Sequence, residues 1–92
     1  MIVGTVRIKL KFFMPNSLKE KRQILKSIIA KISKYNVSVA EVDDNDKWQL
    51  SEIGIAAVSN DKKTIDAIFN SIFQQIDEDG RVEIIDIVKE ML

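Results

Sequence analysis

The chain has 92 residues, 46% of them hydrophobic and 30% charged, and a formal net charge of zero. These values are typical of one globular domain over residues 1–92. The absence of cysteine excludes disulfides, thiolate zinc sites and cysteine nucleophiles, and there is no histidine. No apolar run approaches the roughly 18 residues of a membrane span, and the N-terminus lacks a signal peptide's apolar centre, so we expect a cytoplasmic protein with no membrane partner.

The zero net charge hides a division between two parts of the chain. Residues 1–34 carry nine Lys/Arg against one acid, which gives +8, whereas residues 35–92 carry five Lys/Arg against thirteen acids, which gives −8. Such an asymmetry is an argument about partners, not about fold. Mutual neutralisation of the two parts within one domain is the competing interpretation, since surface ion pairs are common.

The first element is a strand with one buried and one solvated face. Polar and apolar residues alternate strictly through residues 2–12, which is the period of a half-buried strand. The inward positions are Ile2, Gly4, Val6, Ile8, Leu10 and Phe12, and the outward ones are Val3, Thr5, Arg7, Lys9 and Lys11.

A basic amphipathic helix is predicted over residues 17–34. Pro15 favours an extended Met14, and Ser17 with Glu20 forms a capping box. The expected buried stripe and the expected basic positions are both regular at helical spacing. The stripe consists of Leu18, Leu25, Ile28, Ile29 and Ile32, with Ile24 on its edge. Lys19, Arg22 and Lys26 line its flank, and Lys21 projects from the first turn near the apolar seam.

The remaining elements follow in short succession. Asn36 is expected to end the first helix in the left-handed conformation. Strands are predicted over residues 36–42 and 48–59, joined by an acidic turn at residues 43–47. Small residues at positions 54, 56 and 57 would let a helix approach the sheet. A second helix follows the cap at residues 59–61 and runs to Ile76. The last strand, residues 82–88, breaks both alternations, which is consistent with a bulge.

This order, β-α-β-β-α-β, predicts an α+β domain of the ferredoxin-like class. It implies a four-stranded antiparallel sheet with two helices on one face and with strands one and three in the centre. The outward cations Arg7, Lys9 and Lys11 then lie on the helix-free face.

Catalytic motifs are not recognisable in this chain, and we predict a protein that is not an enzyme and needs no cofactor or metal. Residues 13–17 contain neither the glycine nor the arginine of an acylphosphatase phosphate loop. The acidic group Asp43, Asp44 and Asp46 lacks the glycine and distal glutamate of a calcium loop, and turn preference explains it. The aromatic platform of an RNA-recognition motif is absent, because Phe12 has inward parity and Trp48 lies at the hairpin end.

Three blocks of sequence, taken together, resemble a known family. They are SLKEKR at residues 17–22, NVSVAEVDDND followed by Trp48 and Gln49 at residues 36–49, and GIAAVSND at residues 54–61. In this order they are similar to the YlxP-like family of small bacterial proteins, a domain of unknown function. The resemblance implies a ferredoxin-like fold, no assigned catalytic residues, and a translation-linked genomic setting beside genes for an initiation factor and a ribosome-binding factor.

Two hypotheses about function remain. The first is a non-catalytic module that contacts ribosomal RNA or the ribosome; its phosphate-binding residues would be Lys19, Lys21, Arg22 and Lys26, with Arg7, Lys9 and Lys11 as a secondary basic face. A solvated helix face is the alternative interpretation of those helix cations. The second hypothesis is a homodimeric interaction module that uses the open sheet face. Trp48 is either a hairpin packing residue or an anchor for a partner.

Overall fold

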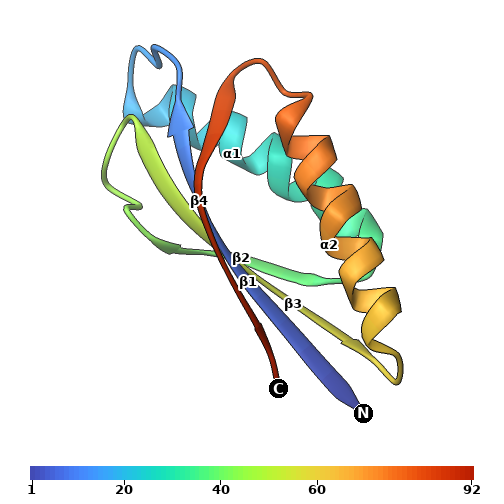
Figure 1. The fold of residues 1–92 in the computed structure, drawn as a ribbon. Helices are drawn as coiled ribbons and strands as arrows, with labels where there is room; N and C mark the ends of the chain where they lie inside the picture. Colours follow the sequence, from blue (N-terminus) through green and yellow to red (C-terminus); the bar gives the residue numbers. More distant parts are fainter.

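The computed structural model describes every residue from Met1 to Leu92. Its elements follow the predicted order, and each strand or helix can be followed by colour in Figure 1. They are β1 (Ile2–Phe12), α1 (Leu18–Ile32), the short 3-10 helix η1 (Ser33–Tyr35), β2 (Ser38–Asp43), β3 (Leu50–Ser59), α2 (Lys62–Asp77) and β4 (Val82–Met91).

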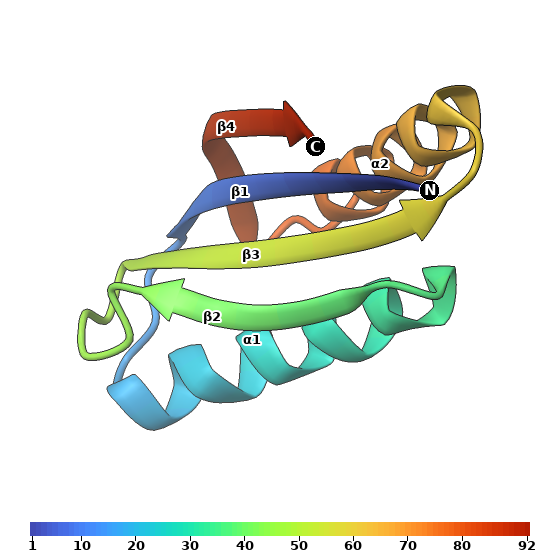
Figure 2. The same ribbon diagram turned by 90° about the horizontal axis from the view of Figure 1, so that it is seen from below.

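The four strands form one antiparallel sheet in the order β2-β3-β1-β4, with β1 and β3 in the centre. Both helices cover the same face, α1 on the β2 side and α2 towards β4 (Figures 1 and 2). The predicted ferredoxin-like βαββαβ architecture is therefore confirmed. No helix has the length and apolar character needed to span a membrane.

The core lies between the sheet and the two helices. The even-numbered positions from Val6 to Phe12 are buried, as the alternation of β1 predicts, and β3 contributes its own alternate positions. The helices bury their apolar stripes on this layer. The sixteen apolar core residues are Val6, Ile8, Leu10, Phe12, Ile24, Leu25, Ile28, Ile32, Ile53, Ile55, Ala57, Ile65, Phe69, Ile72, Ile76 and Val82.

The closest approach of a helix to the sheet occurs at Gly4. A Cβ atom there would lie 2.5 Å from Ile65 Cγ2, which no real contact allows, and Gly4 pairs with the small residue Ala57 on β3. Gly54 and Ala56 do not have this role, contrary to the prediction, because their register with Arg7 and Thr5 places them on the helix-free face. Only Ala57 of the small stretch faces the helices.

The loop geometry confirms one predicted cap and corrects one backbone conformation. Ser17 Oγ accepts a hydrogen bond from the Glu20 amide at 3.1 Å, and Asn36 adopts the left-handed conformation beyond η1. Met14, however, is not extended: its φ is 50°. The loop has to carry the chain from the end of β1 to the helix layer while Pro15 is buried, and this positive φ makes the reversal.

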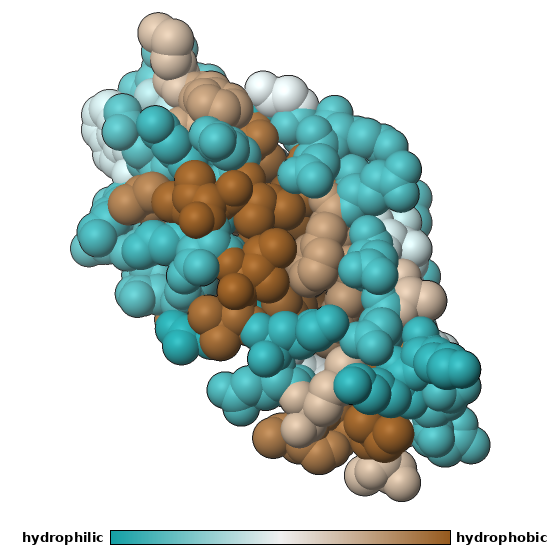
Figure 3. Space-filling view, in the orientation of Figure 1, coloured by the Kyte–Doolittle hydropathy of each residue, from teal (hydrophilic) through white to brown (hydrophobic).

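β4 contains the predicted bulge, and its facing is resolved. The register with β1 shifts between Asp86 and Ile84, so Ile85 is the extra residue. Lys89 Nζ binds Asp66 of α2, which puts Lys89 on the helix side. The strand leaves Ile85, Ile87 and Val88 exposed, and Figure 3 shows a hydrophobic band over its middle. Asp86 Oδ1 accepts from the Ile87 amide at 3.0 Å, a contact that occupies one backbone donor of this edge strand.

Candidate nucleic-acid interface

Three cations project from the exposed side of α1. Lys19, Arg22 and Lys26 are spaced i, i+3 and i+7, so they line one side of the helix, and all three are exposed. The only acid on α1 is Glu20, and it takes part in no ion pair. The six ion pairs of the chain involve other cations, namely Arg7, Lys9, Lys21, Lys47, Arg81 and Lys89. These three α1 cations, here called the α1 flank, are therefore free of internal counter-charges.

Lys21 does not belong to the α1 flank, and its predicted contact with phosphate is wrong. Its side chain is 0% exposed. The physical reason is its helical position: it precedes Ile24, Leu25 and Ile28 by three, four and seven residues, so it shares their buried face. The spacing was visible in the sequence, but a lysine at the centre of an apolar stripe is uncommon.

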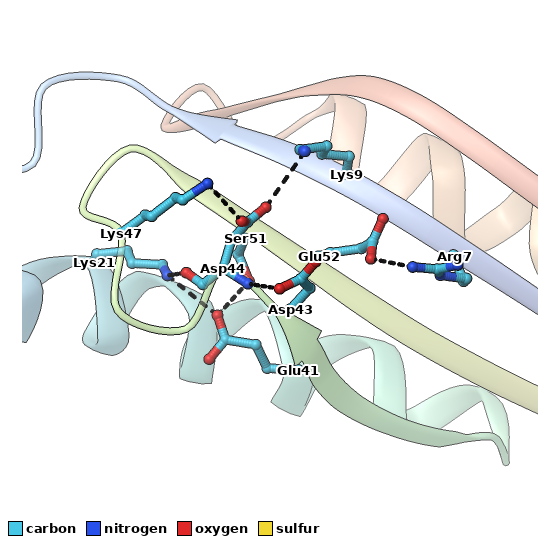
Figure 4. Close-up of polar contacts among 9 residues, drawn as sticks. All are labelled: Arg7, Lys9, Lys21, Glu41, Asp43, Asp44, Lys47, Ser51 and Glu52. Carbon is cyan, nitrogen blue, oxygen red and sulfur yellow. Dashed lines mark hydrogen bonds and ion pairs between the residues drawn. The ribbon is translucent and has the colours of Figure 1, made fainter.

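The buried ammonium of Lys21 is compensated by a polar network (Figure 4). Its Nζ donates to the backbone oxygen of Asp44 at 2.8 Å and to Glu41 Oε2 at 3.2 Å. The same Glu41 oxygen accepts from Ser51 Oγ at 2.5 Å, and the ammonium lies 5.9 Å from the centre of the Phe12 ring. The network joins α1 to the hairpin formed by β2 and β3, so this lysine holds the helix in place.

The secondary basic face predicted on β1 is present, but acids surround it. Arg7 Nη2 lies 2.6 Å from Glu52 Oε2, and this hydrogen bond with the glutamate raises the pKa of Arg7. Lys9 pairs in register with Glu52 on one side and with Asp86 on the other, and Lys11 is opposite Glu83. We call Arg7, Lys9 and Lys11 the β1 row. Two of its cations, Arg7 and Lys9, form ion pairs with carboxylates from the acidic part of the chain, and Lys11 has an acid opposite it on β4.

The acidic turn is organised by lysines. Asp44 is buried, and its Oδ1 lies 3.0 Å from Lys47 Nζ, the contact that does most to lower the pKa of Asp44. Its Oδ2 makes no hydrogen bond but lies 3.5 Å from Lys9 Nζ, within ion-pair range (Figure 4). Asp43 Oδ1 accepts from the Asp44 amide. These contacts connect the hairpin to β1 and account for Asp43 and Asp44 as structural groups.

The helix-free face contains one shallow hollow of about 310 Å³. It owes its depth to small side chains on three adjacent strands, because a sheet face without bulky residues is recessed. Its outward-facing lining residues are Thr5, Arg7, Ser38, Ala40, Val42, Gly54 and Ala56. Trp48 lies outside it, in the loop between β2 and β3, and is 53% exposed.

The fold and these surfaces define a small ferredoxin-like domain with an unpaired basic helix flank and a charge-neutral open sheet. Solved structures of the same architecture support the fold alone. The de novo designed protein LFR1 1 with ferredoxin fold is 15% identical, with a TM-score of 0.58, over 99% of this chain and 85% of the other. The structural-genomics protein YJCS is 11% identical, with a TM-score of 0.52, over 96% of each chain.

The sequence comparisons give the family. Residues 3–89 match the family described as "Protein of unknown function (DUF503)". The chain is 32% identical over 83 residues to "Uncharacterized protein YlxP" of Bacillus subtilis (strain 168), covering 89% of this chain and 90% of that protein. The chain therefore belongs to this family, as its sequence blocks predicted.

Proposed function

We propose that the protein is a non-catalytic module that binds structured RNA or the ribosome in the cytoplasm, with the α1 flank as its phosphate contact. The observation that carries the proposal is that Lys19, Arg22 and Lys26 are exposed, lie together on one side of α1 and form no ion pair, whereas six of the other eleven cations are paired. Clustered exposed cations on one helix side match the electrostatic requirement of phosphate binding. The β1 row contributes little in this proposal, because its charge is already compensated.

The test is the salt dependence of RNA binding. Anisotropy of a labelled ribosomal RNA hairpin is followed from low to physiological salt, and we expect a log–log slope of about one unit per phosphate contact. In the variant K19Q/R22Q/K26Q the affinity falls and the slope shrinks by up to about three units. The folded state is retained, because exposed charges contribute little to stability. Absence of RNA binding at low salt, or RNA binding that added salt does not weaken, would contradict the proposal.

A second copy of the chain on the open sheet face is the alternative function, and the hollow favours it. Small side chains recess this face, while exposed Val58 and Val88 stand beside it, so the same surface offers both a hollow and projecting groups. An isologous dimer needs this kind of self-complementary patch. The neutralised β1 row and the zero net charge remove the electrostatic penalty of self-association.

Light scattering after size exclusion tests the alternative. A dimer of the wild type that becomes monomeric on Ala56→Lys, with Asn60→Lys as an exposed control outside the hollow, would support it. A wild type that is monomeric at tens of micromolar would remove it.

A further inference from the structure

The two loops at one end of the sheet carry the exposed aromatic residues of the chain. Phe13 follows β1 and is 47% exposed, and Trp48 precedes β3 and is 53% exposed. All other phenylalanines and the tyrosine are buried or half-buried. Exposed rings of this size are costly to leave in water and are the side chains most used for contact with partners.

Backbone hydrogen bonds fix the two loops close together. The Phe12 amide donates to the Gln49 oxygen at 2.8 Å, and the Phe13 amide donates to the Arg81 oxygen at 3.0 Å. Phe13 and Trp48 therefore extend from the ends of the two central strands, one residue beyond the Phe12–Gln49 contact. Figure 1 shows both loops at the same end of the molecule. We call Phe13, Met14 and Trp48 the tip.

The tip adjoins the start of the α1 flank. α1 begins at Leu18, five residues after Phe13, and its first exposed cation is Lys19. The surroundings of the tip are close to neutral, because Lys47 forms an ion pair with Asp44 and Lys11 lies opposite Glu83. A phosphate chain along the α1 flank would thus reach two exposed rings where the cations end.

We propose that unpaired bases of the bound RNA stack on Phe13 and Trp48, so that the protein prefers RNA with a single-stranded segment over continuous duplex. The inference rests on the proposed RNA-binding function and adds a substrate class to it. Its chemistry is general: bases stack on aromatic rings with little sequence preference, whereas a paired base in a duplex offers no face to stack on. The cations supply the affinity for phosphate, and the rings select unpaired nucleotides.

Trp48 gives a direct signal, because it is the only tryptophan in the chain. A hairpin with an unpaired loop is compared with a blunt duplex of the same number of phosphates. We expect the loop-containing RNA to quench Trp48 emission and to bind more tightly, and the duplex to leave the emission unchanged. In F13A/W48A, affinity for the loop-containing RNA falls about tenfold or more per removed ring, while affinity for duplex and the salt slope stay as in the wild type. The single variant Trp48→Phe, which keeps an aromatic ring at this position, retains most of the wild-type affinity for the loop-containing RNA.

The matched control is Leu92→Ala, which truncates an exposed apolar side chain at the other end of β1 from the tip, where Leu92 pairs with Val3. Equal binding of the two RNAs with a normal salt slope, or an F13A/W48A variant that keeps the preference, overturns the inference and leaves the proposed function standing. Loss of all RNA binding at low salt in the wild type overturns both. Emission that shifts with RNA-free ribosomal proteins and not with RNA assigns the tip to a protein partner and also overturns the inference.

Discussion

The α1 flank and the β1 row each present three cations, yet their surroundings differ. Arg7 and Lys9 lie within 2.6 Å and 3.5 Å of carboxylates, and the cross-strand register supplies further acids to the row. The cations of the α1 flank face solvent without a partner. Two regions of similar formal charge therefore differ in their capacity to attract phosphate, because only uncompensated charge produces a strong external field.

The difference arises because the side-chain neighbours of a residue come from different parts of the chain on a helix and on a strand. On a helix, the side-chain neighbours of a residue lie three or four positions away, so the α1 flank can meet only acids of its own segment, and Glu20 is the only one there. On a strand, neighbours come from other strands at distant positions in the chain. The acidic part of the sequence thus reaches the β1 row through β3 and β4. On α1 it reaches the buried Lys21 through Glu41, but it leaves the exposed α1 flank unpaired.

The largest expected effect separates a buried cation from an exposed one on the same helix. Lys21→Met keeps most of the side-chain volume but removes the ammonium that pairs with Glu41 and donates to the Asp44 carbonyl; Glu41 keeps only its hydrogen bond from Ser51. Breaking a buried ion pair in this way costs about 3–5 kcal/mol in the free energy of unfolding. Urea unfolding of the variant measures the loss.

Lys26→Met is the matched control, since the same substitution at an exposed, unpaired position should change stability by less than about 1 kcal/mol. Similar losses in the two variants would contradict the buried role of Lys21 and return it to the α1 flank.

The second effect is a pH dependence of stability that arises from the ion pair between Arg81 and Asp79 in one turn. The guanidinium of Arg81 hydrogen-bonds Asp79 and lowers the pKa of that carboxyl to about 2, below its usual 3.8. A lowered folded-state pKa stabilises the protein above the unfolded pKa, and this contribution disappears as the pH falls through about 2. The wild type should therefore melt above Asp79→Asn at pH 5, and the difference in Tm should shrink between about pH 4 and pH 2. A difference that does not depend on pH would argue against the pairing.

The smallest effect measures one pair of the β1 row. In a double-mutant cycle with Arg7→Gln and Glu52→Gln, the coupling at low salt should be measurable but below about 1 kcal/mol, because Arg7 is largely exposed. It should weaken with added salt. Zero coupling at low salt would mean that the row is not neutralised by its neighbours.

Much of the fold could be predicted because its signals are local. The alternation of β1, the Ser17 cap and the left-handed Asn36 each depend on a few adjacent residues, and the structure contains all three. The predictions that failed involve distant contacts. Met14 takes a positive φ to fit its loop, and the sequence does not show that the missing side chain of Gly4 makes room for Ile65. Strand facing at Gly54 depends on register, which one sequence does not supply.

The candidate site divides in the same way. The α1 flank could be predicted because helical spacing alone places Lys19, Arg22 and Lys26 together. The burial of Lys21 could not be predicted with the same ease, since its partners Glu41 and Asp44 are about twenty residues further along the chain. The sequence likewise shows that Phe13 and Trp48 are aromatic but not that two hydrogen-bonded strand ends bring their loops together.

The most direct test of the central claim compares the salt slopes of two triple variants. K19Q/R22Q/K26Q and R7Q/K9Q/K11Q remove the same formal charge, so net charge alone predicts equal effects on RNA binding. If the α1 flank contacts phosphate and the β1 row does not, the α1 variant loses up to about three units of slope, whereas the β1 variant loses less than about one. Equal losses in the two variants, or a larger loss in the β1 variant, would contradict this claim.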